Sequence, residues 1–208
     1  MLMAAVLGDL VGSRRSEDRV ALHARVQRAL AEVNEMLSPV VPLRLTVGDE
    51  YQGGFATVGE AVRATLRLRL ALAADVRHGL GWGSADLLQD EPRVEDGPAW
   101  WVARDAIVAV EEEAARPATR WRRTSYRRAE GTDGPDPATL EAMLILRDRA
   151  VADLDDRGLR LLDGLLGGRT QRDLADDLGI SASAVSQRVR SDGLSAIVAA
   201  DEALVVAP

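Results

Sequence analysis

The chain has 208 residues, of which 47% are hydrophobic and 28% are charged, a balance typical of a folded globular protein. No apolar run approaches the roughly 18 residues that a membrane-spanning helix needs, so we expect a cytoplasmic protein with no membrane partner. Cysteine is absent and histidine occurs only at His23 and His78, which excludes thiolate metal sites and favours magnesium over zinc. The net charge of −7 argues against a protein that coats nucleic acid non-specifically, but it permits a local DNA-reading surface.

The first 128 residues alternate between strand-like and helix-like patterns, which predicts an α+β fold. An apolar run predicts a strand at residues 3–7, alternation predicts a hairpin from 43–47 and 51–56, and helical spacing covers 17–37 and 59–74. The remaining expectations in this part are a strand at 76–82, a polar loop at 84–98, a helix at 98–113 and an arginine-rich strand at 119–126. The order β-α-β-β-α-β indicates a ferredoxin-like or palm-type sheet with helices on one face. Gly79, Gly81 and Gly83 mark a close approach of another backbone.

Residues 129–137 (AEGTDGPDP) combine Gly, Pro and Asp without periodicity and are predicted to be a linker. They divide a palm-like domain at 1–128 from a small all-α helix-turn-helix domain at 138–208. A helix that begins at Pro137 supplies either a dimer contact or packing onto its own domain, and the sequence leaves both open.

A turn-linked pair of helices is predicted near the C-terminus, after a helix at 155–166. Thr170 is placed to cap a helix at 171–178, Gly179 to make the turn, and Ser181 to cap a second helix that runs to about Arg190. The stretch TQRDLADDLGISASAVSQRVR resembles the helix-turn-helix of many bacterial regulators, whose second helix enters the major groove of DNA. The DNA-contacting candidates are Thr170, Gln171, Ser181, Ser183, Ser186, Gln187, Arg188 and Arg190. A homodimer is expected to read two half-sites, and the alternative is a helical bundle with no role at DNA.

Two acidic loops follow predicted strands. Asp9 lies in GDLVGSRR and Asp49 follows Gly48, and a palm sheet brings both loops to one rim. Paired carboxylates repel unless a cation lies between them, so Asp9 and Asp49 are metal candidates, with Mg²⁺ the expected ion. Gly12, Ser13 and Arg14 are phosphate-binding candidates, because Gly12 and Ser13 are expected to open the first helix. The alternative is that Asp9 caps a helix and Asp49 fills a turn.

The motifs AAVLGDLVGSRR, TVGDEYQG, VRHGLGWGSADL and DGPAWWVARDAI, with a helix-turn-helix after them, resemble the SatD family. The first part of that family is similar to class III nucleotidyl cyclases and GGDEF domains. The resemblance implies metal binding by Asp9 and Asp49 and a phosphate-stabilising, catalytic role for Arg104 if the protein is an enzyme. Cyclases carry an asparagine where this chain has Trp100, and a base-reading lysine is missing before Asp49.

Two functions follow as hypotheses. The preferred one is a DNA-binding transcriptional regulator whose palm-like domain senses a nucleotide or another phosphate ligand. The alternative is a Mg²⁺-dependent, cyclase-like enzyme that acts on nucleoside triphosphates. The pair Trp100-Trp101 could stack on a base, but the sequence favours one ring in the core and the other over a helix edge.

Overall fold

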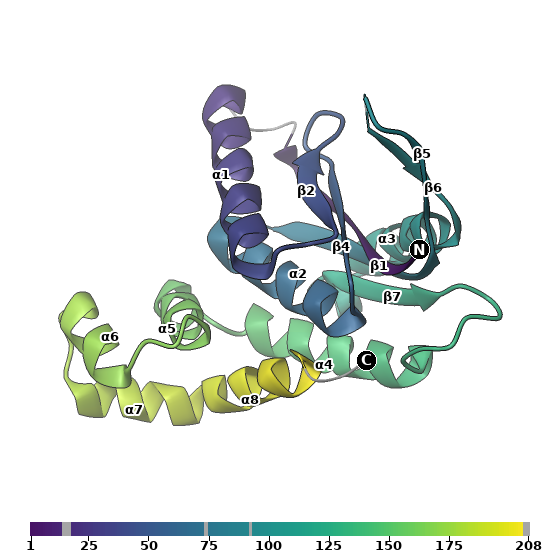
Figure 1. Cartoon of the computed structure of the whole chain (residues 1–208). Helices are drawn as coiled ribbons and strands as arrows, with labels where there is room; N and C mark the ends of the chain where they lie inside the picture. The colour runs from purple at the N-terminus through teal and green to yellow at the C-terminus, as the bar shows by residue number, and fades with distance from the viewer. Residues whose placement is uncertain (14–17, 73–74, 92, 206–208) are drawn as a thin grey trace.

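The computed structural model describes residues 1–13, 18–72, 75–91 and 93–205, which form a five-stranded mixed sheet, helices on both of its faces and a group of C-terminal helices (Figure 1). The strand order is β2-β3-β1-β4-β7, and the three pairs formed among the first four strands of this order are antiparallel. This order and the two intervening helices confirm the predicted ferredoxin-like arrangement. The elements are β1 (Leu2–Leu10), α1 (Arg19–Leu37), β2 (Val41–Leu45), β3 (Tyr51–Phe55), α2 (Val58–Leu72) and β4 (Val76–Ser84).

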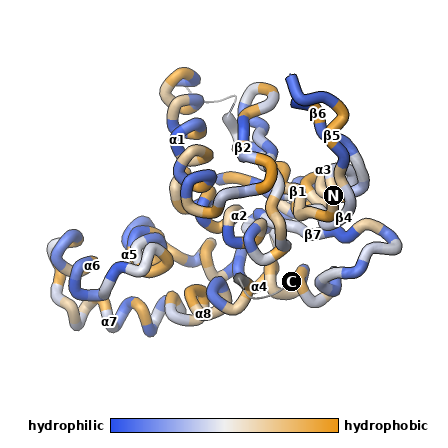
Figure 2. Tube along the Cα trace, viewed as in Figure 1, coloured by the Kyte–Doolittle hydropathy of each residue, from blue (hydrophilic) through white to orange (hydrophobic). Residues whose placement is uncertain are grey.

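The sheet is covered on both faces, because successive side chains of β1 point in opposite directions. Ala4 and Val6 lie in one buried cluster with residues of α1 and α2, whereas Met3 and Ala5 lie in a second cluster with residues of α3 (Pro98–Ala114). The expectation of helices on one face is therefore wrong for α3. Figure 2 shows hydrophilic and hydrophobic residues mixed along α1, as expected for a helix with one buried side.

The glycines of β4 explain how α3 packs so closely on the sheet. A Cβ added to Gly79 would lie 2.2 Å from the Ala103 carbonyl oxygen, and one added to Gly81 would lie 2.1 Å from that of Ala99. Both distances are too short for real atoms, so only glycine allows the helix backbone to rest on the strand. The close approach predicted from these glycines is confirmed.

The polar loop predicted at residues 84–98 is wrong, because this segment holds a second, two-stranded sheet. Strands β5 (Asp86–Gln89) and β6 (Val94–Asp96) pair antiparallel and extend beyond the main sheet (Figure 1). Their register shifts between Leu87 and Gln89. Leu87, Leu88 and Val94 are exposed, so the hairpin lacks the buried alternation by which strands are recognised in a sequence.

The last strand of the main sheet, β7 (Thr124–Arg128), runs parallel to β4 and follows a short 3₁₀ turn at Pro117–Thr119. After the predicted linker, α4 (Pro137–Ala152) packs against β7. Leu140 and Leu144 of α4 belong to the same buried cluster as α1 and α2. Of the two interpretations of this helix, the structure therefore supports packing onto the first part of the chain.

The four C-terminal helices build a third buried cluster, which also includes Leu66 of α2 and Val151 of α4. These helices are α5 (Asp156–Leu166), α6 (Gln171–Leu178), α7 (Ala182–Ser191) and α8 (Leu194–Val205). Helices α6 and α7 protrude at the end of the molecule away from the β5–β6 hairpin (Figure 1). None of the described helices is long and apolar enough to cross a membrane.

Helix α2 holds the C-terminal helices through three arginines. Arg63 pairs with Asp201 of α8 at 2.6 Å, Arg67 donates to the Leu166 carbonyl at the end of α5, and Arg69 reaches Asp148 of α4 at 3.5 Å. Asp201 is 4% exposed and Asp148 is fully buried. Buried ionic contacts therefore fix the C-terminal helices relative to the sheet.

Candidate functional site

A cavity of about 80 Å³ lies between α3 and the ends of β1 and β3, and Asp9, Glu50 and Arg104 line it. The β1–β3 register pairs Gly8 with Tyr51, which brings the end of β1 beside the β2–β3 turn. The two acidic loops therefore do meet at one end of the sheet. Glu50, rather than the predicted Asp49, is the residue of the second loop that lines the cavity.

The Asp9 carboxylate is held by an arginine of the neighbouring strand. Arg77 is its register partner on β4 and donates from Nε to Oδ1 at 3.0 Å and from Nη2 to Oδ2 at 2.5 Å. Arg77 also pairs with Glu111 of α3 at 3.0 Å. The hydrogen bonds that Arg77 donates to Asp9 raise the pKa of Arg77 above its usual range. A bidentate arginine thus supplies the positive charge that the sequence led us to expect from a metal.

The donor set does not fit a magnesium ion in this arrangement, because both oxygens of Asp9 accept hydrogen bonds from Arg77. No group of three or more metal-binding side chains occurs among the described residues. Asp49 lies in the turn after Gly48, whose φ of +66° is the left-handed conformation that glycine favours. Metal binding by Asp9 and Asp49 stays a prediction.

Arg104 is the cation that faces the cavity. It lies on α3 with 54% of its side chain exposed, and Nη2 is 3.7 Å from Oε2 of Glu50. An exposed ion pair at this distance contributes little to stability, so an anion could take the place of Glu50 at low cost. The position of Arg104 suits phosphate binding.

Gly12 and Ser13 of the predicted phosphate loop do not lie at the start of helix α1. Helix α1 begins at Arg19 and is capped by Asp18, so the expectation that Gly12 and Ser13 open this helix is wrong. Gly12 has a φ of +73° and Ser13 is 8% exposed, and neither belongs to the described lining of the cavity. Arg14 lies outside the described residues. Phosphate binding by these three residues stays a prediction.

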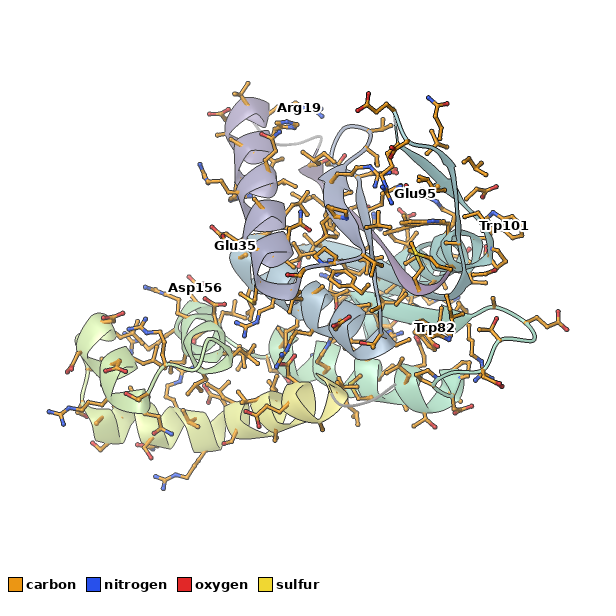
Figure 3. The ribbon with its side chains drawn as sticks, in the orientation of Figure 1. Arg19, Glu35, Trp82, Glu95, Trp101 and Asp156 are labelled. Atoms are coloured by element: carbon orange, nitrogen blue, oxygen red, sulfur yellow. The ribbon has the colours of Figure 1, made fainter. Side chains whose placement is uncertain are left out.

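A second cavity, of about 410 Å³, adjoins the first, because Leu7, Gln52 and Arg104 line both. Trp100, Trp101 and Glu95 complete most of its wall. Trp100 is 8% exposed and Trp101 is 57% exposed, as expected for one core ring and one ring at a helix edge. Figure 3 shows Glu95 and Trp101 on the same side of the molecule as the β5–β6 hairpin.

Sequence analysis missed Gln52 and Glu95. Glu95 lies within the segment that was predicted to be a loop, and its pairing with β5 gives no apolar signal. Gln52 lies opposite Leu7 and therefore on the face of the sheet that α3 covers, a placement that depends on the β1–β3 register.

Tyr51 and His78 lie side by side on the opposite face of the sheet. The Tyr51 hydroxyl and His78 Nε2 are 2.6 Å apart, and both side chains are buried. Burial lowers the pKa of His78 to about 3, and Arg147 and Arg69 contribute to the same shift. His78 is therefore neutral at physiological pH and serves packing rather than acid–base chemistry.

The turn-linked helix pair has well-formed ends. Thr170 and Asp173 form a capping box at the start of α6, Gly179 adopts the left-handed conformation after it, and Ser181 accepts from the Ala184 N–H at the start of α7. The buried sides of the two helices include Leu174, Ala175, Val185 and Val189. The predicted helix bounds, caps and turn are confirmed in this region.

The polar residues of α7 separate into two groups. Ser183, Ser186, Gln187 and Arg190 follow one helical stripe, because they are three, four and seven positions apart. Arg188 lies off this stripe and pairs with Asp155 at 2.9 Å and with Asp192 at 2.7 Å. Arg188 therefore links α7 to the start of α5. The other candidates, Thr170, Gln171 and Ser181, lie at the starts of α6 and α7, where Thr170 and Ser181 act as caps.

The architecture is that of a palm-type α+β domain with ferredoxin-like strand order, to which a group of helices is joined. A family model, the SatD family, matches residues 3–124. The chain belongs to the SatD family.

No curated protein matches the chain. Among solved structures, a bacterial light-regulated adenylyl cyclase is similar with 13% identity and a TM-score of 0.47 over 61% of this chain and 43% of that one. The chain thus spans less than half the length of that cyclase. The guanylate cyclase domain from Catenaria anguillulae, solved in complex with GTP, has 16% identity and a TM-score of 0.42 over 51% and 72%. A regulator of polyketide synthase expression from Bifidobacterium adolescentis has 13% identity and a TM-score of 0.29 over 98% and 85%.

Proposed function

We propose that this protein is a DNA-binding transcriptional regulator whose palm-like part binds a nucleotide or a related phosphate ligand. In this proposal α6 and α7 form a helix-turn-helix domain, and α7 enters the major groove. The phosphate of the ligand binds at the cavity that Asp9, Glu50 and Arg104 line.

The stripe on α7 is the observation that carries the DNA-binding part. Its side chains can donate to and accept from base edges, and Arg190 can bind guanine or a phosphate. Helix α7 itself holds no carboxylate, so no negative charge from this helix opposes the phosphates. Among the described carboxylates none pairs with Arg190, whereas Arg188 has two partners. We therefore assign base contact to Ser183, Ser186, Gln187 and Arg190, and a structural role to Arg188.

Selection of duplexes from a random pool, followed by affinity measurement on the enriched sequence, tests this assignment. Arg190→Ala should weaken binding by about 5- to 150-fold, which corresponds to about 1–3 kcal/mol for one arginine–guanine pair. Arg25→Ala on α1 is the matched control, because it removes an exposed arginine from a remote helix. Failure to enrich any sequence, or equal affinity of Arg190→Ala and the control, contradicts DNA reading by α7.

A dimer is part of this proposal, since a single helix-turn-helix binds DNA weakly. Helix α4 buries Leu140 and Leu144 on the sheet side and leaves Leu146 71% exposed and Ile145 37% exposed on its outer side. We propose that this outer side joins two copies. Leu146→Asp should shift the protein from dimer to monomer in sedimentation, whereas Leu88→Asp on the exposed hairpin should not. A wild-type monomer at micromolar concentration contradicts the proposed dimer.

The ligand-binding part rests on Arg104, a half-exposed cation beside a cavity at the end of the sheet. Thermal unfolding with a panel of nucleotides tests it. A ligand at 100 times its Kd adds about 2.7 kcal/mol, which raises the Tm of a chain of this size by about 5–11 °C. Arg104→Ala should abolish the shift and Arg116→Ala should retain it. The proposal fails if no phosphate compound stabilises the wild type.

The enzyme hypothesis gains no support from the geometry of this cavity. Its first metal ligand, Asp9, is paired with Arg77 at both carboxylate oxygens. A metal would have to displace a bidentate arginine that is only 15% exposed. We therefore prefer the regulator.

A further inference from the structure

The second cavity is large enough for a nucleotide base. Its volume of about 410 Å³ lies within the usual range for small-molecule sites, whereas the first cavity, of about 80 Å³, is too small for a nucleotide. The two cavities share Leu7, Gln52 and Arg104. A ligand with phosphates at Arg104 therefore has room for its base only in the second cavity.

One hydrogen-bond donor in the lining of this cavity lacks an acceptor within the described part of the chain, and a second such donor lies behind Glu95. Trp100 lines the cavity and is 8% exposed, and its indole N–H is unpartnered. Arg44 donates from Nη2 to Glu95 at 2.6 Å, while its buried Nη1 is unpartnered. A buried donor without an acceptor costs free energy, so Trp100 favours a ligand that brings an acceptor to this cavity.

Glu95 supplies a buried acceptor at the same cavity. Its side chain is 2% exposed and is held by Arg44 at 2.6 Å and by Arg93 at 2.5 Å. Although burial alone would raise the pKa of Glu95, the hydrogen bonds from these two arginines bring it below its usual range. Glu95 is therefore ionised, and each carboxylate oxygen can accept a further hydrogen bond.

Trp101 supplies an exposed aromatic face. Its side chain is 57% exposed, and its indole N–H donates to Oδ1 of Asp96 at 2.6 Å, which restrains the ring. A restrained ring loses little conformational freedom when a second ring stacks on it.

We propose that the second cavity binds the guanine base of a nucleotide whose phosphates lie at Arg104, with Trp101 as the stacking surface and Glu95 as the base-reading acceptor. Guanine has a carbonyl oxygen that can accept from the indole N–H of Trp100. It also has N–H groups on its other edge that can donate to Glu95. Adenine has an amino group where guanine has the carbonyl, and it has no ring N–H on that edge. The assignment rests on the proposed ligand site and names its ligand class.

Calorimetric titration of the full chain with GTP, ATP and inorganic tripolyphosphate tests the base separately from the phosphates. GTP should bind at least about tenfold more tightly than either of the others, as expected for one stacked and hydrogen-bonded base. Trp101→Ala should weaken GTP binding by about tenfold and leave tripolyphosphate binding unchanged. Trp121→Ala removes a tryptophan that neither cavity includes, and it should behave as the wild type.

Glu95→Gln tests the reading of the base, because an amide replaces one acceptor with a donor. The preference of GTP over ATP should fall by about tenfold. Retention of the full preference in this correctly folded variant overturns the role of Glu95.

The outcomes separate this inference from the function on which it rests. Equal binding of GTP, ATP and tripolyphosphate, all lost in Arg104→Ala, overturns the guanine site and leaves the phosphate site in place. Absence of binding by all three compounds overturns both. Tighter binding of ATP than of GTP overturns the choice of guanine.

Discussion

The buried carboxylate of Asp148 offers the sharpest test of how α4 is attached to the sheet. Asp148 lies on α4 with no exposed surface, and its Oδ2 accepts from the backbone N–H groups of Arg123 and Thr124, each at 2.7 Å. Arg69 and Arg147 lie 3.5 Å from its Oδ1. Asp148→Ala would leave two cations and two backbone donors without this partner. We expect a loss of about 3–5 kcal/mol, the usual cost of removing one partner from a buried ion pair.

A loss of this size lowers the Tm of a chain of this length by about 6–20 °C. Urea denaturation followed by circular dichroism measures it, and Asp153→Ala on the same helix is the control. Asp153 pairs with Arg149 while both side chains are more than half exposed, so its removal should cost only about 0.3–0.5 kcal/mol. Similar stability of the two variants would refute the inference that a buried ionic cluster ties α4 to the sheet.

Three further predictions follow from the packing and the buried charges. Gly81→Ala should destabilise the fold by about 1–3 kcal/mol or more in urea denaturation, because its Cβ would overlap the backbone of α3; an unchanged midpoint contradicts this. His78 has a folded pKa of about 3, below its ordinary 6.5. The unfolded chain therefore takes up the proton first, and stability falls as pH drops from about 6.5 towards 3. His78→Gln should flatten that part of the pH–stability profile. The hydrogen bonds from Arg188 and the Gly158 N–H lower the pKa of Asp155 to about 2, so its stabilising effect is complete above about pH 4 and is lost towards pH 2. Asp155→Asn should remove that acid-sensitive step, and an identical acid titration would contradict the role of the pair.

Periodicity in the sequence predicted the main elements because their burial is regular. Helices α1 and α3 each bury one side, α2 is buried around most of its circumference, and β1 is buried on both faces. The alternate glycines of β4 also correctly predicted the close approach of another backbone, which is that of α3. Because these glycines form a row on the face of the sheet opposite α1 and α2, they also imply a second helical layer on that face.

The candidate site could be predicted only in part, because its contacts depend on strand register. Asp9 follows a buried strand in the sequence, and its pairing with Asp49 at one rim and the resemblance to cyclases suggested a metal ligand. Its actual partner, Arg77, becomes adjacent only when β1 and β4 pair with Asp9 opposite Arg77. Glu95 and Gln52 likewise reach one cavity from separate strands. No local pattern in the sequence encodes such long-range neighbours.

The attachment of the C-terminal helices bears on how a ligand could control DNA binding. A flexible linker between two domains would allow them to change their relative arrangement. Arg63, Arg67 and Arg69 of α2 instead hold α8, α5 and α4 against the sheet through contacts that involve buried groups. Breaking several such contacts would cost more than the 1–3 kcal/mol that typical allosteric coupling supplies. A ligand at α3 would therefore need less free energy to change how two copies pair. Such a change alters the spacing of the two α7 helices without opening the protomer. When sedimentation and DNA binding are measured together, the ligand should change the dimer dissociation constant and the affinity for DNA in parallel. A change in DNA affinity at constant dimerisation would instead indicate movement within one chain.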